Sequence, residues 1–222
     1  IAFDLEERGM VGSYYFAAQS PVKMNKIVAF LTADMVGRSL WNLATKYLFL
    51  MGAEHSPEIL AFEKQLSPGD FVLASVGADL IGSRSDYAPF RDEEIPFLFL
   101  SSGEHPDYHR PTDTVEKIDF GKVAKASEIM VAFAKNFANA EKKPSYQAEN
   151  LTSVEELKTI RGVIQLLIEN PQAVKASESQ VGTLKTFVAK LDGWIAKGTV
   201  SQEERRELAN QIGLLLLLLG GR

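Results

Sequence analysis

Residues 95–100 read Ile-Pro-Phe-Leu-Phe-Leu, and a polar stretch, Ser-Ser-Gly-Glu-His-Pro-Asp-Tyr-His-Arg-Pro-Thr-Asp-Thr at 101–114, follows them directly. A continuous apolar run bounded by polar residues is typical of a strand that is buried on both faces of a sheet. The irregular segment after it begins where that strand ends, and loops held by rigid strands often carry function. The pair predicts a central strand with a functional loop at its carboxyl end.

Short β-rich runs and helical patterns alternate on both sides of this strand. The runs at 26–32, 47–51 and 71–76 are strand candidates, and a helix is expected from Pro57 to about Leu66, with Ser56 as its N-cap. Apolar residues from Phe120 to Phe137 recur every three or four positions, which predicts an amphipathic helix packed on the sheet. The alternation predicts an α/β sandwich. The first three residues, Ile-Ala-Phe, also read as a strand, so we expect further sequence before residue 1.

The β signal stops at a polar break, Glu-Lys-Lys-Pro at 141–144, and we place a boundary there, between segments 1–143 and 144–222. Three helices are expected beyond it, at about 153–169, 179–196 and 202–219. Thr152 with Glu155, and Ser201 with Glu204, fit the capping box at two helix starts. The apolar stripes of these helices predict a common core in a small all-α unit. Their members are Val154, Leu157, Ile160 and Ile164; Val181, Leu184, Val188 and Leu191; and Leu208, Ile212, Leu215 and Leu219.

Composition narrows the function classes. The formal net charge is −5, which argues against a nucleic-acid partner because phosphate binding usually needs a basic face. The chain contains no cysteine, so any metal would have to be held by His, Asp and Glu. The apolar run Leu214–Leu219 is too short to span a membrane.

Two glutamates, Glu6 and Glu7, come just before Gly9 and Gly12. Neighbouring residues on a regular strand point to opposite faces, so both can serve one site only if the chain turns there. The two glycines permit such a turn. The alternative is an ordinary acidic helix start.

Two further carboxylates stand at the ends of apolar runs, where open α/β sheets bind ligands. Asp34 ends the run that begins at Lys26, and it is either a strand-terminating residue or a ligand. Asp86 lies in Ser-Asp-Tyr-Ala-Pro-Phe, residues 85–90, and its alternative is a helix N-terminus that favours a negative charge.

The three histidines are His55, His105 and His109. We interpret His55 as structural, because a lone histidine is more often structural than a ligand. His105 and His109 share the loop at 101–114 with several ionisable side chains, and we expect one of the two to contact a metal.

Taken in order, these pieces resemble the M28 family of zinc metallopeptidases. The family pattern of a strand that runs into Glu-Glu, then Gly and Gly-Ser, is matched by FDLEERGMVGS at 3–13. Three more family motifs follow, matched by TADMVG at 32–37, SDYAPF at 85–90 and DYHRPTDTVEKI at 107–118. The resemblance covers about residues 1–140. It implies a three-layer sandwich with a mixed β-sheet of the zinc-exopeptidase type.

The resemblance also implies roles for individual residues. Glu6 would be the general base that activates a metal-bound water, and Tyr108 would donate a hydrogen bond to the oxyanion. Glu7, Asp34 and His109 would bind Zn²⁺, two ions in the intact family site, with Asp86 in a supporting position. The implied function is a zinc-dependent aminopeptidase that cleaves peptides, and the family leads us to expect an extracytoplasmic location.

The family site also needs an upstream His-x-Asp and a bridging aspartate, and neither occurs in this sequence. We therefore expect the chain to be a fragment that is inactive alone, completed by an upstream segment or by a separate piece. Two alternatives stay open: a single-zinc acyltransferase like the glutaminyl cyclases, and a non-catalytic interaction module that uses the C-terminal helices.

Overall fold

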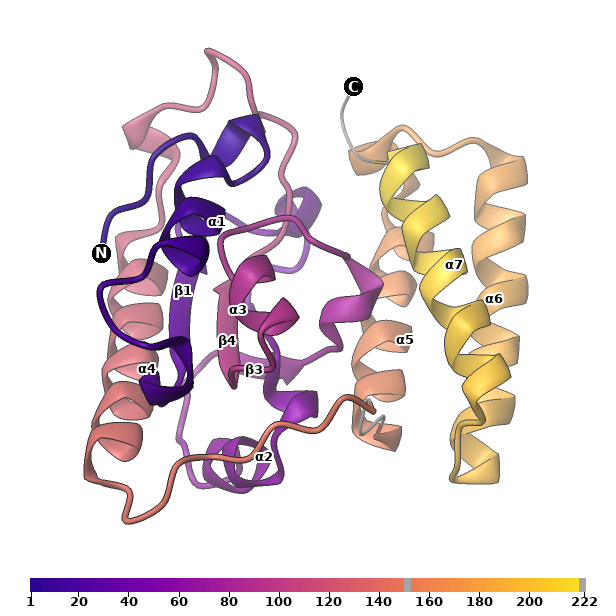
Figure 1. Ribbon diagram of the computed structural model, residues 1–222. Helices are drawn as coiled ribbons and strands as arrows, with labels where there is room; N and C mark the ends of the chain where they lie inside the picture. The colour runs from indigo at the N-terminus through magenta and orange to yellow at the C-terminus, as the bar shows by residue number, and fades with distance from the viewer. Residues whose placement is uncertain (150–152, 220–222) are drawn as a thin grey trace.

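A mixed four-stranded sheet forms the centre of the computed structural model, which describes residues 1–149 and 153–219. The strands are β1 (Phe30–Asp34), β2 (Tyr47–Met51), β3 (Val72–Ser75) and β4 (Phe97–Ser101), in the order β1-β4-β2-β3. β1 pairs with β4 and β2 with β3 in parallel, whereas β2 and β4 are antiparallel. Figure 1 shows helices on both sides of this sheet. The predicted three-layer sandwich with a mixed sheet is confirmed.

β4 is the central strand that the sequence predicts. It pairs with β1 on one side and β2 on the other, and all five of its residues are buried. Because successive side chains of a strand point to opposite faces, Phe97 and Phe99 join one hydrophobic core while Leu98 and Leu100 join another. The strand is apolar throughout because both of its faces are covered.

One face of the sheet is covered by α4 (Phe120–Asn139), with α2 (Pro57–Glu63) beside it. The buried side chains of α4 include Ala126, Ile129, Phe133 and Phe137, close to the predicted stripe. Phe120 does not belong to that stripe, because its side chain is 64% exposed at the first residue of the helix. The N-cap is Asp119, whose side chain accepts from the N–H of Lys122.

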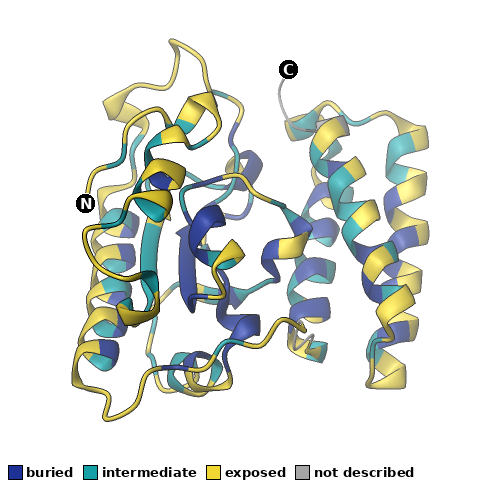
Figure 2. Cartoon of the chain, viewed as in Figure 1, coloured by how far each residue is buried: buried dark blue, intermediate teal, exposed yellow. Residues whose placement is uncertain are grey.

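The opposite face is covered by the C-terminal helices α5 (Val154–Glu169), α6 (Glu178–Lys197) and α7 (Gln202–Leu219). Their positions match the predicted ranges to within a residue or two. Buried residues of the three helices share one core with Phe49, Met51 and Phe99 of the sheet. Figure 2 shows the buried stripe on each of them. The helices thus form a third layer of the sandwich, and the boundary at 143 stays a prediction.

Side-chain caps begin the C-terminal helices. Ser201 and Glu204 form the predicted capping box, since the Glu204 N–H donates to Ser201 Oγ and the Ser201 N–H donates to Glu204 Oε2. At α5 the N-cap is Ser153, which accepts from the N–H of Glu156. Thr152 and the Leu219 side chain lie outside the described residues. The side chain of Ser56 does not cap α2, because its hydroxyl donates to Glu58 instead.

The N-terminal segment differs from the prediction. Residues 1–3 form no strand, and β1 begins at Phe30 rather than at Lys26, which lies in a 3-10 turn. The ring of Phe3 packs against Phe16, Phe30 and Phe90. The apolar character of this segment therefore serves an aromatic cluster instead of sheet pairing.

Shorter helices complete the chain. They are α1 (Val11–Ala18), α3 (Ala88–Asp92) and the 3-10 helices η1 (Glu6–Arg8), η2 (Met24–Lys26), η3 (Leu40–Asn42), η4 (Ala53–His55), η5 (Ala78–Leu80), η6 (Val115–Lys117) and η7 (Pro171–Val174). Over residues 1–149 and 153–219, no helix combines the length and apolar character that crossing a bilayer requires.

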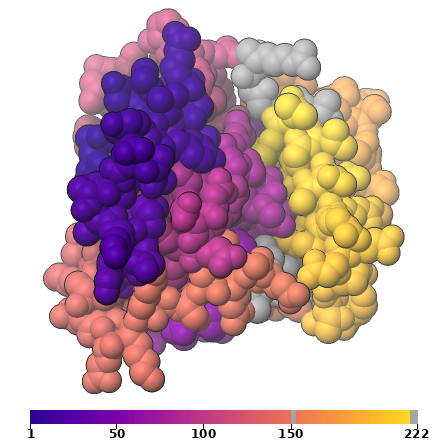
Figure 3. Space-filling model, in the orientation of Figure 1, coloured from indigo at the N-terminus to yellow at the C-terminus, as the bar shows by residue number. Residues whose placement is uncertain are grey.

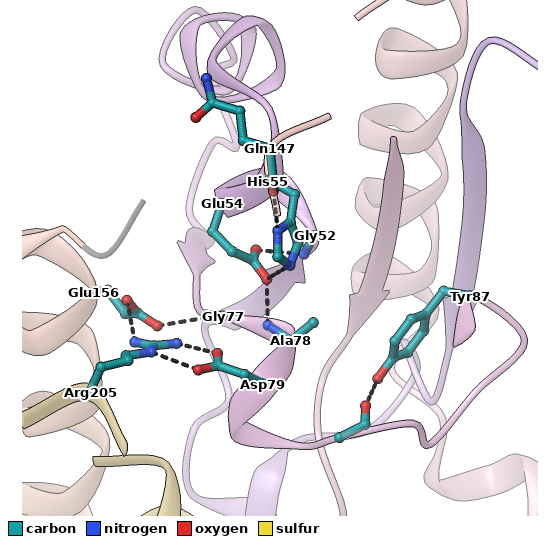
Figure 4. A network of polar contacts seen from close by, with 11 residues as sticks. Gly52, Glu54, His55, Gly77, Ala78, Asp79, Tyr87, Gln147, Glu156 and Arg205 are labelled. Atoms are coloured by element: carbon teal, nitrogen blue, oxygen red, sulfur yellow. Dashed lines mark hydrogen bonds and ion pairs between the residues drawn. The ribbon is translucent and has the colours of Figure 1, made fainter. Parts of the chain in front are cut away.

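A buried ionic network joins the C-terminal helices to the sheet (Figure 4). Arg205 of α7 binds Asp79 of η5 and Glu156 of α5, with Arg205 Nη1 2.8 Å from Glu156 Oε2. Glu156 accepts from the N–H of Gly77, and the second carboxylate, Glu54, accepts from the N–H groups of Gly52 and Ala78. We define the network as Glu54, Asp79, Glu156 and Arg205. It fixes α5 and α7 against the loop that follows β3.

Candidate active site

The first part of the site is η1, which carries Glu6 and Glu7. The turn is bracketed by left-handed residues, with φ 57° at Leu5 and 86° at Gly9. Gly12 closes it, since its N–H donates to Asp4 O and an added Cβ would lie 2.3 Å from that oxygen. The chain therefore turns at the two glutamates, as the glycines predict.

Asp34 is the last residue of β1, at the carboxyl end of the strand. Its partner in the parallel register is Ser101, the last residue of β4. The loops after β1 and β4 therefore start side by side, at one edge of the sheet.

Tyr108 and His109 lie in the loop after β4. Their rings stack with centroids 3.8 Å apart, and His109 adopts a left-handed backbone with φ 55°. His109 Nε2 lies 3.0 Å from Glu7 Oε1, so the loop after β4 meets η1 directly.

These residues share one cavity of about 680 Å³, within the range of small-molecule sites. Glu6, Glu7, Asp34, Tyr108 and His109 all line it. The structure thus brings together the five residues that were predicted to act in catalysis or metal binding. Their roles stay predictions.

Asp86 stands apart from these five, because it does not line the cavity. It lies near enough for its charge to raise the pKa of both Glu6 and Asp34. The N-cap of α3 is Tyr87, which makes no side-chain cap bond, and Asp86 does not cap the helix either. A supporting position behind the cavity wall agrees with this placement.

The carboxylates of the site repel one another. Burial raises the pKa of Glu6, and the charges of Glu7, Asp86 and Asp34 raise it further. Burial also raises the pKa of Asp34, and Glu7 adds to that rise. The site therefore favours a positive charge or a proton.

Other charged residues hold the loop after β4 in place. Arg38 pairs with Asp107 at 2.8 Å and with Asp113 at 2.6 Å, and Lys117 also binds Asp107. Hydrogen bonds from Lys117 and Arg38 hold the pKa of Asp107 well below its usual range. Arg38 follows Asp34 by four residues in the sequence, but nothing in that spacing indicates its partners.

The two other histidines have structural surroundings. His55 is buried, and its Nδ1 lies 2.8 Å from the carbonyl oxygen of Gln147, as the structural interpretation predicts. His105 is also buried, with Nε2 3.5 Å from Asp113 Oδ2, and burial lowers its pKa.

The donor types at the cavity suit Zn²⁺, which takes imidazole nitrogen and carboxylate oxygen. The number of donors is smaller than such a site needs. Among residues 1–149 and 153–219, no three His, Asp or Glu side chains are close enough together to hold a metal ion. Glu7 and His109 are the pair that the structure places in direct contact.

An acidic cavity at the carboxyl edge of a mixed, three-layer α/β sheet is an arrangement found in hydrolytic enzymes of the exopeptidase type. The sequence profile of peptidase family M28 matches residues 1–134, which is more than half of the chain. The chain belongs to peptidase family M28.

Individual relatives agree with the family. The chain is 26% identical over 140 residues to a probable leucine aminopeptidase of Arthroderma benhamiae, covering 61% of this chain and 37% of that protein. It is 25% identical over 155 residues to the aminopeptidase YwaD of Bacillus subtilis, covering 65% and 32%. The LapA aminopeptidase of Legionella pneumophila is similar in structure, with a TM-score of 0.49, 23% identity and coverage of 63% and 39%. The chain thus spans about a third of the length of these curated relatives.

Proposed function

We propose that this chain is the part of a zinc-dependent aminopeptidase that carries the general base and several metal ligands. The observation that carries the proposal is the shared cavity, in which Glu6 and Glu7 of η1, Asp34 of β1 and His109 of the β4 loop converge. Three segments that are distant in sequence supply these groups. Membership of peptidase family M28 supports peptide hydrolysis as the reaction class.

Glu6 is suited to act as the general base. Its pKa is raised by burial and by neighbouring carboxylates, toward the range where a carboxylate accepts a proton efficiently. The contact between Glu7 and His109 leaves Glu6 free to receive a proton from the attacking water. Glu6 would then return that proton to the leaving amine.

Tyr108 lines the same cavity, with its ring stacked on His109. Burial raises the pKa of its phenol, so Tyr108 stays protonated and can donate a hydrogen bond. We assign it to the oxygen of the scissile carbonyl, where negative charge develops during attack.

Glu7, His109 and Asp34 are the residues that would hold zinc. A bound Zn²⁺ supplies a water of lowered pKa and polarises the carbonyl. Because the described residues contribute too few donors close together, we propose that the remaining ligands come from outside this chain segment.

The proposal is tested on the full-length protein with aminoacyl-nitroanilides. Hydrolysis should disappear after dialysis against a chelator and return when Zn²⁺ is added. An N-acetylated aminoacyl-nitroanilide is the control, because an aminopeptidase requires a free α-amine. Hydrolysis that survives complete metal removal would contradict the zinc assignment.

The glutaminyl-cyclase alternative is separated by a second substrate. A glutaminyl peptide should be cleaved to free glutamine by an aminopeptidase, whereas a cyclase would release ammonia and leave a pyroglutamyl peptide. Mass spectrometry of the products decides between them.

A further inference from the structure

The cavity that contains the acidic residues extends well beyond them. At one end lie Glu6, Glu7 and Asp34, and the other end is walled by α5 and α7. Figure 3 shows α7 (yellow) beside residues from the middle of the chain, with the N-terminal segment (indigo) on the far side. The C-terminal helices lie beyond residues 1–134, which the family profile matches, so their place in this cavity is a property of this chain.

The helices present apolar side chains to the cavity at helical spacing. Val163 and Ile164 contribute from α5, and Ile212 and Leu216 from α7. Val163, Ile212 and Leu216 are only partly buried in the structure, so they have surface left to contact a ligand. The wall is rigid, because Arg205 ties α7 to Glu156 of α5 and to Asp79.

Trp41 provides a second, independent observation. Its side chain is 5% exposed and lines the cavity, yet within the described chain its indole Nε1–H has no acceptor. Its backbone is left-handed, at φ 52°, which is uncommon for a bulky residue. A hydrogen bond of 2.8 Å from the Trp41 N–H to Glu104 O maintains this conformation. A buried donor without a partner is costly, and strained residues cluster at ligand sites.

We propose that α5, α7 and Trp41 form the binding pocket for a bulky apolar side chain at the amino end of a peptide. The inference rests on the proposed function and deepens it. The acidic end of the cavity suits the cationic α-amine, and the apolar end accepts an aliphatic or aromatic side chain. The indole N–H donates to a carbonyl oxygen of the bound peptide. The C-terminal helices therefore determine which substrates the peptidase accepts.

The first test compares leucyl- and alanyl-nitroanilide hydrolysis in Val163→Phe, which fills the pocket from α5. We expect the ratio of kcat/KM for leucine over alanine to fall about tenfold or more, because a hydrophobic pocket discriminates at this level. Val131→Phe on α4 is the matched control, since Val131 is 50% exposed. An unchanged ratio in Val163→Phe, at an unchanged thermal midpoint, would overturn the pocket.

A second variant guards against misfolding. Ile212→Ala removes atoms from the α7 wall and should shift preference from leucyl toward the larger phenylalanyl substrate. If Val163→Phe does not fold, a ratio that stays constant in Ile212→Ala overturns the proposal.

Binding separates this inference from the proposed function. The chain has two tryptophans, so a Trp194→Phe background leaves Trp41 as the fluorescent probe. L-leucinamide should bind more tightly than L-alaninamide, and Val163→Phe should abolish the difference. A protein that hydrolyses neither substrate but keeps this binding preference refutes the peptidase proposal and upholds the pocket. Equal binding of both amides refutes the pocket.

Discussion

Two groups of carboxylates in this molecule have opposite surroundings. The acidic cluster, which comprises Glu6, Glu7, Asp34 and Asp86, lies at and behind the cavity at the carboxyl edge of the sheet. The buried ionic network lies between the sheet and the C-terminal helices. In the network, an arginine and three backbone N–H groups meet the carboxylates. In the cluster, the carboxylates mainly meet each other, with His109 as a neighbour of Glu7.

The difference teaches what each group is for. A buried charge persists in a fold when it is paired and hydrogen-bonded, and the network meets that condition. A cluster of like charges costs stability unless a cation or proton joins it, and such sites tend to be functional. Changes in the cluster should therefore affect activity more than stability, and changes in the network should do the reverse.

The largest expected effect is on turnover. Glu6→Gln keeps the shape of the side chain but cannot accept a proton, so kcat should fall by about 10²–10⁴-fold. Zinc content and the thermal midpoint should stay as in the unchanged protein. The exposed substitution Glu128→Gln on α4 is the control. Full turnover in Glu6→Gln would remove Glu6 from the mechanism.

The second effect is on stability. Arg205→Met leaves the buried Glu156 without its cation, and removal of one partner of a buried pair costs about 3–5 kcal/mol of unfolding free energy. Urea unfolding measures the loss. The double substitution Arg205→Met/Glu156→Leu should recover part of it, because the unpaired charge is then gone. A double variant no more stable than Arg205→Met would show that the pair acts mainly through packing.

The third effect depends on pH. Burial raises the pKa of Glu54 to about 7, whereas in the unfolded chain it is near 4.5. Between these values the folded state holds more protons than the unfolded state, so stability falls as pH rises from 4.5 to 7. The loss amounts to at most about 3 kcal/mol.

Glu54→Gln should flatten this dependence. The comparison is the unfolding free energy of both proteins at pH 5 and pH 8. A parallel decline in the two proteins would assign the pH dependence to other groups.

The smallest effect concerns the start of α7, which carries Arg205. Ser201→Ala removes the acceptor of the Glu204 N–H and should cost about 1 kcal/mol. Ser177→Ala at the capping box of α6 is the comparison, since it caps a helix without a network arginine. A much larger loss at Ser201 than at Ser177 would show that the cap also positions Arg205.

The sequence predicts elements better than their pairing. β4 was recognisable because both of its faces are buried, and α5, α6 and α7 because period and caps agree. Strand order could not be read, since it depends on contacts between distant segments. The apolar Ile1–Phe3 misled the strand prediction, because periodicity does not distinguish sheet pairing from an aromatic cluster.

The site shows the same division. Glu6, Glu7, Asp34 and His109 were found through family motifs, and the structure places them in one cavity. Trp41 and the walls from α5 and α7 carry no local signal. Their part in the cavity follows from the packing of helices whose stripes predict only a common core.

The register between β1 and β4 also has a consequence for how the molecule is made. It places Asp34 opposite Ser101, residues far apart along the chain, and the loop with His109 starts from that junction. Such non-local pairing requires closure of a long loop and slows folding. During synthesis Glu6, Glu7 and Asp34 emerge early and lack their histidine neighbour until β4 inserts between β1 and β2. A nascent chain is therefore incapable of assembling this centre until nearly half of its length has been translated.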